Sequence, residues 1–131
     1  MGHGGSKSNS NSTENLSQLK QITQNAKDRK HEKKVLAEAK YNHMINRRVF
    51  KEANRISKFV LSGKLTKRAN KGKNTYLYKK FKHYHGSYTC REFDMYSKLC
   101  KQYYQFYGVA ISLKTEKHYG YYGCEVILSW E

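Results

Sequence analysis

The spacing of hydrophobic residues divides the chain into a helical first half and a mixed second half. Leu16, Leu19 and Ile22 recur at three-residue steps, which predicts a short amphipathic helix. Residues 35–60 then keep one apolar face at a period of about 3.6 residues, which predicts a longer helix that stops at Gly63. The residues of that face are Val35, Ala39, Val49, Ala53, Ile56 and Val60.

A polar segment and an alternating segment follow the second helix. Residues 62–74, SGKLTKRANKGKN, are rich in Gly, Asn and Lys and predict an exposed loop. Residues 75–85, TYLYKKFKHYH, are rich in β-forming residues and predict a strand. One face of that strand would carry Leu77, Lys79, Phe81, His83 and His85, and the other Tyr76, Tyr78, Lys80, Lys82 and Tyr84.

A third helix is predicted after this strand. Thr89 followed three residues later by Glu92 fits a capping box, which marks the start of a helix, and Gly108 marks its end. The residues that share its apolar face are Phe93, Tyr96, Leu99, Cys100, Tyr103 and Phe106.

Two further alternating segments predict a C-terminal antiparallel hairpin. Residues 109–113 and residues 124–130 each alternate apolar with other side chains, and a turn is expected around residues 115–118. The element order predicts the α+β class: a basic N-terminal helical arm of one or two helices, then a small β-α-β-β domain. The expected parts are a disordered Gly/Ser/Asn tail at 1–13, the basic helical arm at 14–62 and the small α+β domain at 63–131.

The charge balance of the chain predicts the class of its partner. The chain holds 26 Lys and Arg against 10 Asp and Glu, a formal net charge of +16, and no acidic residue lies between Glu52 and Glu92. Lysines and arginines that contact phosphates release condensed counterions, so such a surface favours polyanions. We therefore expect a basic protein that binds RNA, DNA or a nucleoprotein. The expected phosphate contacts are Arg47, Arg55, Lys58, Lys64, Lys67, Arg68, Lys71, Lys73, Lys80 and Lys82.

Three tyrosines of the predicted strand lie among these lysines. Tyr76, Tyr78 and Tyr84 would share a face with Lys80 and Lys82, which suits a single strand because rings stack on bases while ammonium groups meet phosphates. The alternative is that the tyrosine face packs under the predicted third helix as part of the core. In that case the basic segment 64–73 still provides an exposed phosphate-binding surface.

Two other classes of function fit the same composition. A short chain that is rich in Lys, Asn and Tyr and lacks proline is typical in style of a phage or viral product, such as an inhibitor that docks on a host nucleic-acid enzyme. The first residues, MGHGGSK, also fit the pattern for N-myristoylation at Gly2. An acylated chain with a polybasic segment would be a membrane-peripheral virion or matrix-like protein.

The segment FKHYHGSYTC, residues 81–90, holds the candidate chemistry. His83, His85 and Cys90 are metal-ligand types, but their spacing matches no usual zinc pattern. The His-Tyr-His run resembles the His-hydrophobic-His strand of rolling-circle initiators and relaxases. That resemblance implies a divalent cation held by the two histidines and attack on DNA by a helical tyrosine. The candidates for this nucleophile are Tyr96, Tyr103 and Tyr107.

The remaining patterns argue against an enzyme. The sequence contains no paired-carboxylate set, no Ser/His/Asp signature and no phosphate-binding glycine loop, and it predicts no cofactor. A metal-dependent nuclease or strand-transferase is retained only as the alternative just described. Cys90, Cys100 and Cys124 lack close pairing, and no signal peptide or membrane span is evident, which predicts a reducing intracellular compartment, cytoplasm or nucleoid or nucleus, rather than secretion.

Overall fold

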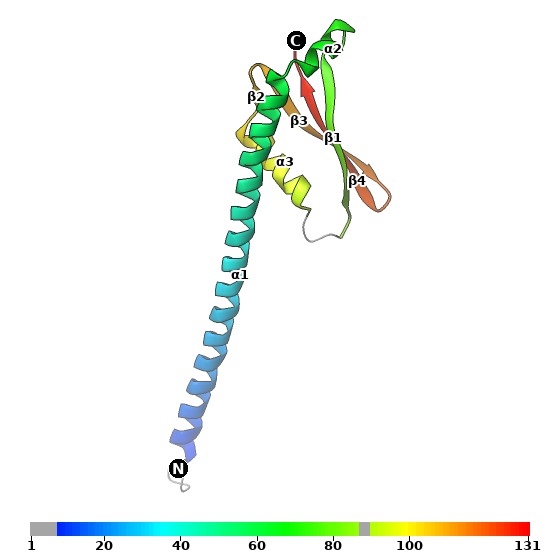
Figure 1. Ribbon diagram of the computed structural model, residues 1–131. Coiled ribbons are helices and arrows are strands. Elements are labelled where there is room, and N and C mark those ends of the chain that lie inside the picture. The colour runs from blue at the N-terminus through cyan, green and yellow to red at the C-terminus, as the bar shows by residue number, and fades with distance from the viewer. Residues whose placement is uncertain (1–7, 87–89) are drawn as a thin grey trace. The chain divides into compact units, whose positions relative to one another are not determined.

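The computed structural model describes residues 8–86 and 90–131, and it is α+β as the sequence predicts. The chain divides into two compact units, Met1–Asn42 and His43–Glu131, and the boundary falls inside the first helix. The elements are α1 (Ser8–Leu61), α2 (Lys64–Asn70), β1 (Thr75–Tyr84), α3 (Arg91–Gln102), β2 (Gln105–Phe106), β3 (Val109–His118) and β4 (Tyr121–Ser129), as labelled in Figure 1.

The described part of the first unit is the N-terminal portion of α1. The two helices expected before residue 62 are one continuous helix, and it begins at Ser8, inside the segment predicted to be a disordered tail. Residues 1–7 of that tail lie outside the described residues. Leu16, Leu19 and Ile22 are 54%, 60% and 61% exposed, so their three-residue spacing does not mark a buried face.

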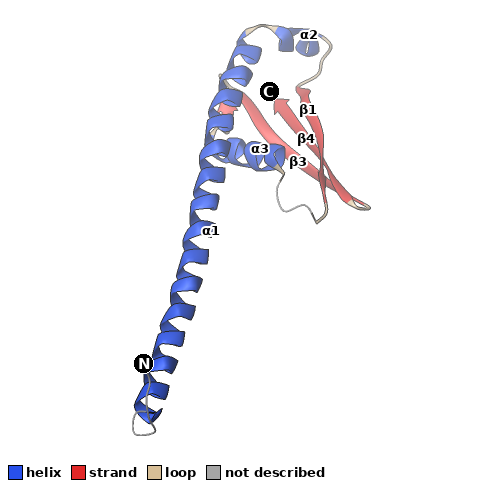
Figure 2. Cartoon of the chain, turned by 60° about the horizontal axis from the view of Figure 1, so that its bottom comes forward, coloured by secondary structure: helices blue, strands red, loops and turns tan. Residues whose placement is uncertain are grey.

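The second unit is built on a four-stranded sheet with strand order β1-β4-β3-β2, in which every neighbouring pair is antiparallel. The end of α1 and helix α3 lie on the same face of this sheet, as Figures 1 and 2 show. Ring contacts agree with this view, because Phe59 of α1 packs on Tyr76 while Tyr96 of α3 stacks on Phe81. The other face of the sheet carries no helix in the described residues.

The core of this unit forms between that helical layer and the inner face of the sheet. The apolar stripe predicted along residues 35–60 is buried only in its second part, where Val49 is 1% and Ile56 0% exposed, whereas Val35 is 49% exposed. The compact unit therefore begins at His43, further toward the N-terminus than the domain expected at residue 63. The core residues are Ile45, Val49, Ala53, Ile56, Leu65, Phe81, Met95, Tyr96, Leu99, Phe106, Val109, Ile111, Cys124, Val126 and Leu128.

A β-bulge interrupts the alternation of β1. Tyr76 pairs with Leu128 and Leu77 with Ile127, but the next paired residue is Lys79, opposite Val126, so Tyr78 is the extra residue. A bulge places two residues of one strand opposite one residue of its partner. The prediction that one face carries every second residue from 76 to 84 is therefore wrong: Leu77 shares the outer face with Lys80, Lys82 and Tyr84, and Tyr76 lies on the inner face.

Three element boundaries also differ from the prediction. The expected loop 62–74 contains helix α2, whose Leu65 is 8% exposed and therefore contributes to the core. The third helix ends at Gln102 rather than Gly108, and Phe106 is buried in β2 instead. Tyr107 and Gly108 both have positive φ, of 51° and 84°, which favours a tight hairpin over a continued helix. Strand β3 runs to His118, so the turn expected at 115–118 lies beyond it.

The capping box predicted at the start of α3 can be compared with the structure only in part. Thr89, the expected capping residue, lies outside the described residues. The residue at the N-cap is Cys90, with an extended backbone. Glu92 and Asp94 occupy the first turn, where the positive end of the helix dipole stabilises carboxylates.

A pair of leucine substitutions tests the placement of the core. Leu99 is fully buried on α3, and Leu77 is 47% exposed on the outer face of β1. We expect Leu99→Ala to lower the free energy of unfolding by about 2–5 kcal/mol, because it leaves a cavity. Leu77→Ala should change it by about 0.5 kcal/mol or less. Urea denaturation followed by circular dichroism measures the free energy of unfolding of both variants. Equal losses would contradict the assignment of Leu99 to the core and of Leu77 to the exposed face of the sheet.

Candidate functional site

The predicted phosphate contacts of segment 64–73 lie on the surface. Lys64, Lys67, Lys71 and Lys73 are all exposed, the first two on α2 and the others in the segment that joins α2 to β1. Arg68 is half-buried, and its Nε donates a hydrogen bond of 3.1 Å to the carbonyl oxygen of Thr75. Arg68 therefore tethers α2 to the start of β1, which leaves the four lysines as the accessible cations of this segment.

Two of the three predicted stacking tyrosines face the helical layer. The ring centroid of Phe59 lies 5.1 Å from that of Tyr76 and 5.4 Å from that of Tyr78, and both tyrosines are half-buried. Burial, and next the negative charge of Glu52, raise the pKa of Tyr78 above its usual value. These two rings thus pack on the helical layer, as the core alternative expects, but their ring contacts are with Phe59 of α1 and not with the third helix. Their shared face with Lys80 and Lys82 does not exist, because the bulge separates them.

Tyr84 remains on the outer face of the sheet, where it belongs to a cluster of rings and cations. This cluster, called here the outer-face cluster, consists of Lys80, Lys82, Tyr84, Lys114, His118 and Tyr121. His118 and Tyr121 stack with centroids 4.8 Å apart and planes at 16°, and the Nζ of Lys82 lies 4.8 Å from the Tyr121 centroid. The Tyr84 ring is 57% exposed and lies 6.2 Å from the Tyr121 ring.

A hollow of about 400 Å³ adjoins this cluster. Gly123, on the central strand β4, contributes no side chain to it, and a Cβ added there would lie 3.2 Å from Nε2 of His118. Glu116 and Glu125 also line the hollow. His118 and Glu116 form a weak ion-pair contact of 4.0 Å, which is fully charged only when the imidazole is protonated. The outer face therefore presents a recess bordered by rings, ammonium groups and two carboxylates.

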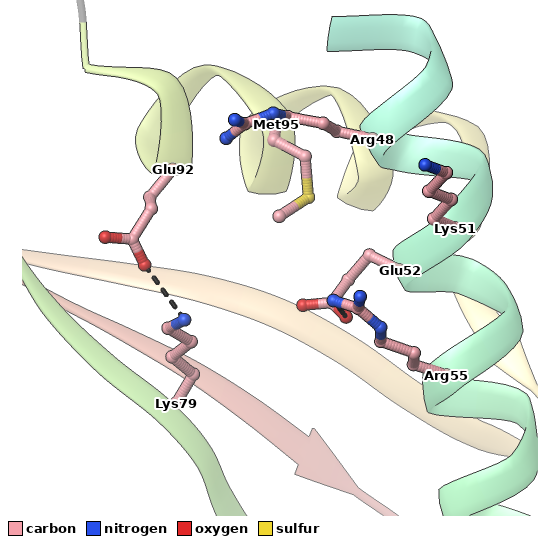
Figure 3. Close-up of a pocket in the computed structure, with 7 residues that line it drawn as sticks. All are labelled: Arg48, Lys51, Glu52, Arg55, Lys79, Glu92 and Met95. Carbon is pink, nitrogen blue, oxygen red and sulfur yellow. Dashed lines mark ion pairs between the residues drawn. The ribbon is translucent and has the colours of Figure 1, made fainter.

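A second recess, of about 520 Å³, lies between α1, α3 and β1 (Figure 3). Its inner wall holds Glu52, which is 6% exposed and is the single buried charged residue in the described part of the chain. The hydroxyl of Tyr96 donates a hydrogen bond to Oε2 of Glu52. Burial of the ring, and next this hydrogen bond, raise the pKa of Tyr96 far above its usual value. The pair links α1 to α3 inside the core.

The basic residues around this recess divide into paired and unpaired cations. Arg55 lies 3.8 Å from Glu52, and Lys79 lies 3.1 Å from Glu92 of α3. Arg48 and Lys51 point into the same region from α1 (Figure 3), and neither forms an ion pair within the described residues. Two of the expected contacts, Arg47 and Lys58, are exposed on α1 outside this recess.

The two histidines considered as metal ligands pack on aromatic rings. The ring centroids of His83 and Phe93 lie 4.8 Å apart, and those of His85 and Tyr122 lie 4.4 Å apart. Cys90 is the half-buried N-cap of α3. Burial raises the pKa of the thiols of Cys100 and Cys124, which disfavours the thiolate that a metal requires. Among the described residues, no group of three or more His, Cys, Asp or Glu side chains could hold a metal ion.

The tyrosines considered as helical nucleophiles occupy three different environments. Tyr96 is buried and bonded to Glu52, so its hydroxyl is not accessible to a substrate. Tyr103 terminates α3 with an extended backbone, and Tyr107 lies in the hairpin turn between β2 and β3 rather than in a helix. The arrangement implied by the resemblance to rolling-circle initiators is therefore not assembled by these residues.

Sequence reasoning missed the residues of β3 and β4 that complete the outer-face cluster. The alternation of Cys124, Val126 and Leu128 already assigns Tyr121 to the opposite face of the same strand. His118 is added by the pairing of β3 with β4, which places it directly opposite Tyr121. This pairing depends on where the hairpin turns, so the sequence contained the signal for Tyr121 but not for His118.

Comparisons with known proteins add no family to this description. No protein-family model matches the chain, and searches of curated proteins and of solved structures find no match. Within the described residues, no helix combines the length and the apolar character needed to cross a bilayer. Gly2, the candidate lipidation site, lies outside the described residues.

The Glu52–Tyr96 pair predicts a distinct pH dependence of stability. Tyr96→Phe removes the hydroxyl that donates to buried Glu52, and we expect it to cost about 1–3 kcal/mol near neutral pH. Because folding raises the pKa of Tyr96 above its usual 10.0, the wild type loses stability as pH rises above 10, where only the unfolded chain gives up this proton. The phenylalanine variant lacks this loss, so the stability difference should shrink by up to about 1.4 kcal/mol per pH unit.

Urea denaturation at a series of pH values from 7 to 11 measures this difference. Tyr104→Phe, at a tyrosine that is 70% exposed, is the matched control and should follow the wild type throughout. A Tyr96→Phe variant with wild-type stability at every pH would contradict the assigned hydrogen bond.

Proposed function

We propose that this chain binds nucleic acid without catalysis, through the basic surface of the unit His43–Glu131. The observation that supports the proposal most is the concentration of charge there: residues 43–131 hold 18 of the chain's 26 Lys and Arg and only 6 acidic residues. A surface with this imbalance attracts a polyanion over a Debye length of about 8 Å at physiological ionic strength.

The few carboxylates of this unit leave most of that charge uncompensated. Glu52 is engaged by Tyr96 and Arg55, and Glu92 is engaged by Lys79. Within the described residues, the exposed lysines 67, 71, 73, 80 and 82 form no ion pair. Cations without carboxylate partners can contact phosphates without first breaking a salt bridge. These five lysines are therefore the main phosphate-binding surface of the proposal.

The arrangement of potential catalytic groups supports a binding role rather than an enzymatic one. The buried carboxyl of Glu52 is occupied by Tyr96, and the histidines at 83 and 85 pack on aromatic rings. General acid–base catalysis requires a titratable group that can reach the reacting atoms, and neither set offers one in this state.

A salt titration tests the proposal directly. We expect the affinity of the full chain for a fluorescein-labelled oligonucleotide, measured by fluorescence anisotropy, to fall steeply between about 50 and 200 mM salt. A protein that neutralises about 6–10 phosphates loses roughly 10³–10⁵ in affinity over this range. An affinity that does not change with salt would contradict binding through phosphates, and absence of binding at low salt would overturn the proposed function.

Charge reversal locates the surface. The variant with glutamate at lysines 71, 73, 80 and 82 should lose detectable binding, because these exposed cations are replaced by charges that repel phosphate. The matched control reverses lysines 20, 27, 30 and 33, which are exposed in the other unit and change the net charge equally. Equal losses in the two variants would mean that overall charge, and not this surface, determines binding. Circular dichroism confirms that each variant is folded.

A further inference from the structure

The outer face of the sheet has the composition of a platform for unpaired bases. On β1, β4 and β3 it presents the outer-face cluster (Lys80, Lys82, Tyr84, Lys114, His118 and Tyr121), and no described helix covers it. Tyr84 is 57% exposed, so apolar area of its ring remains in contact with water. Covering that area with the flat face of a base would be favourable.

The geometry of the cluster separates a place for bases from a place for phosphates. His118 stacks on Tyr121, and the ammonium of Lys82 lies near the Tyr121 ring, so a displaced lysine would leave a ring face open to a base. The exposed ring of Tyr84 offers a second stacking surface on the neighbouring strand. Lys80, on the same strand face, is exposed and positioned to meet the phosphate that joins two stacked nucleotides.

The hollow above Gly123 adds a reason for bases to face inward. It has a volume of about 400 Å³, within the range of small-ligand sites, and Gly123, which carries no side chain, is one of the residues that line it. Glu116 and Glu125 line it, and carboxylates repel phosphates but accept hydrogen bonds from the amino groups of bases. A strand bound with its bases over the hollow and its phosphates toward the lysines satisfies both groups.

This arrangement suits a single strand and not a duplex. The bases of a duplex are stacked on one another, so their faces cannot reach rings that stand on a sheet. The major groove of DNA, about 12 Å wide, admits a helix or a two-stranded ribbon. Here the cluster is spread over three adjacent strands of the sheet, which is neither of these two elements.

We propose that the outer face of the sheet binds single-stranded nucleic acid, with bases stacked on Tyr84 and on the His118–Tyr121 pair and one base seated in the hollow above Gly123. This inference rests on the proposed function, and it adds the strandedness of the ligand and the residues that contact its bases. It assigns a role to Tyr121 and His118 that charge alone does not suggest.

The test compares a short fluorescein-labelled single strand of mixed sequence, as DNA and as RNA, with the matching duplex at constant salt. Tyr84→Ala and His118→Ala each remove an exposed ring, and each should weaken single-strand binding about fivefold or more while changing duplex binding less than about twofold. Tyr84→Phe keeps the ring and Tyr104→Ala removes an exposed tyrosine outside the cluster, so both should stay within about twofold of wild type.

A substitution at Gly123 provides a second arm. Gly123→Val would introduce a Cβ 3.2 Å from Nε2 of His118 and add two methyl groups to the recess. It should weaken single-strand binding at least as much as His118→Ala and leave the duplex unaffected. Thermal unfolding followed by circular dichroism checks its fold, and the two alanine variants decide the question if this variant does not fold.

The outcomes distinguish this inference from the function on which it rests. If the wild type binds single strands and duplex equally, or if both alanine variants bind like the wild type while reversal of lysines 71, 73, 80 and 82 abolishes binding, the stacking platform is wrong and nucleic-acid binding stands. If the wild type binds no oligonucleotide at low salt, both are wrong. A selective loss of single-strand affinity in the ring variants supports both.

Discussion

The bulge at Tyr78 is the constraint on which the two faces of the sheet depend. Phe59 contacts the rings of both Tyr76 and Tyr78, which holds the start of β1 against α1. Further along the strand, Phe81 must reach the core to stack on Tyr96. In a regular strand residues 78 and 81 point to opposite faces, so one extra residue is required to bring both inward. The bulge satisfies both contacts.

This local change determines the chemistry of each surface. Because the bulge directs Lys79 inward, that lysine pairs with Glu92 at the edge of the helical layer and contributes to the fold. Lys80 and Lys82, the next outward residues, remain exposed beside the strand that carries Tyr121. The inner face is thereby closed by helices through aromatic contacts, and the outer face is left with aromatic rings and cations together. The functional proposals follow from this asymmetry between faces.

The sequence predicted the elements better than their ends and faces. Alternation at Cys124, Val126 and Leu128 marked β4 and its buried side correctly, because a strand at the centre of the sheet has a strictly periodic environment. The bulge could not be predicted, since it arises from contacts with Phe59, a residue distant in sequence. Phe106 looked helical from spacing alone, but the turn at Tyr107 and Gly108 returns the chain into a hairpin. The basic character of the surface was readable from composition, whereas the outer-face cluster required the strand pairing.

The crowding of cations on the unit His43–Glu131 also affects its thermodynamics. The eighteen basic residues of this small unit far outnumber its six acidic residues, and the net repulsion among the like charges is weaker in the expanded chain, so it subtracts from the stability of the fold. An anion that binds only the folded state adds stability by mass action, about 2.7 kcal/mol at a hundredfold excess over its dissociation constant. Under the proposed function, folding and ligand occupancy would be thermodynamically linked, and the melting temperature would rise with the concentration of the bound polyanion.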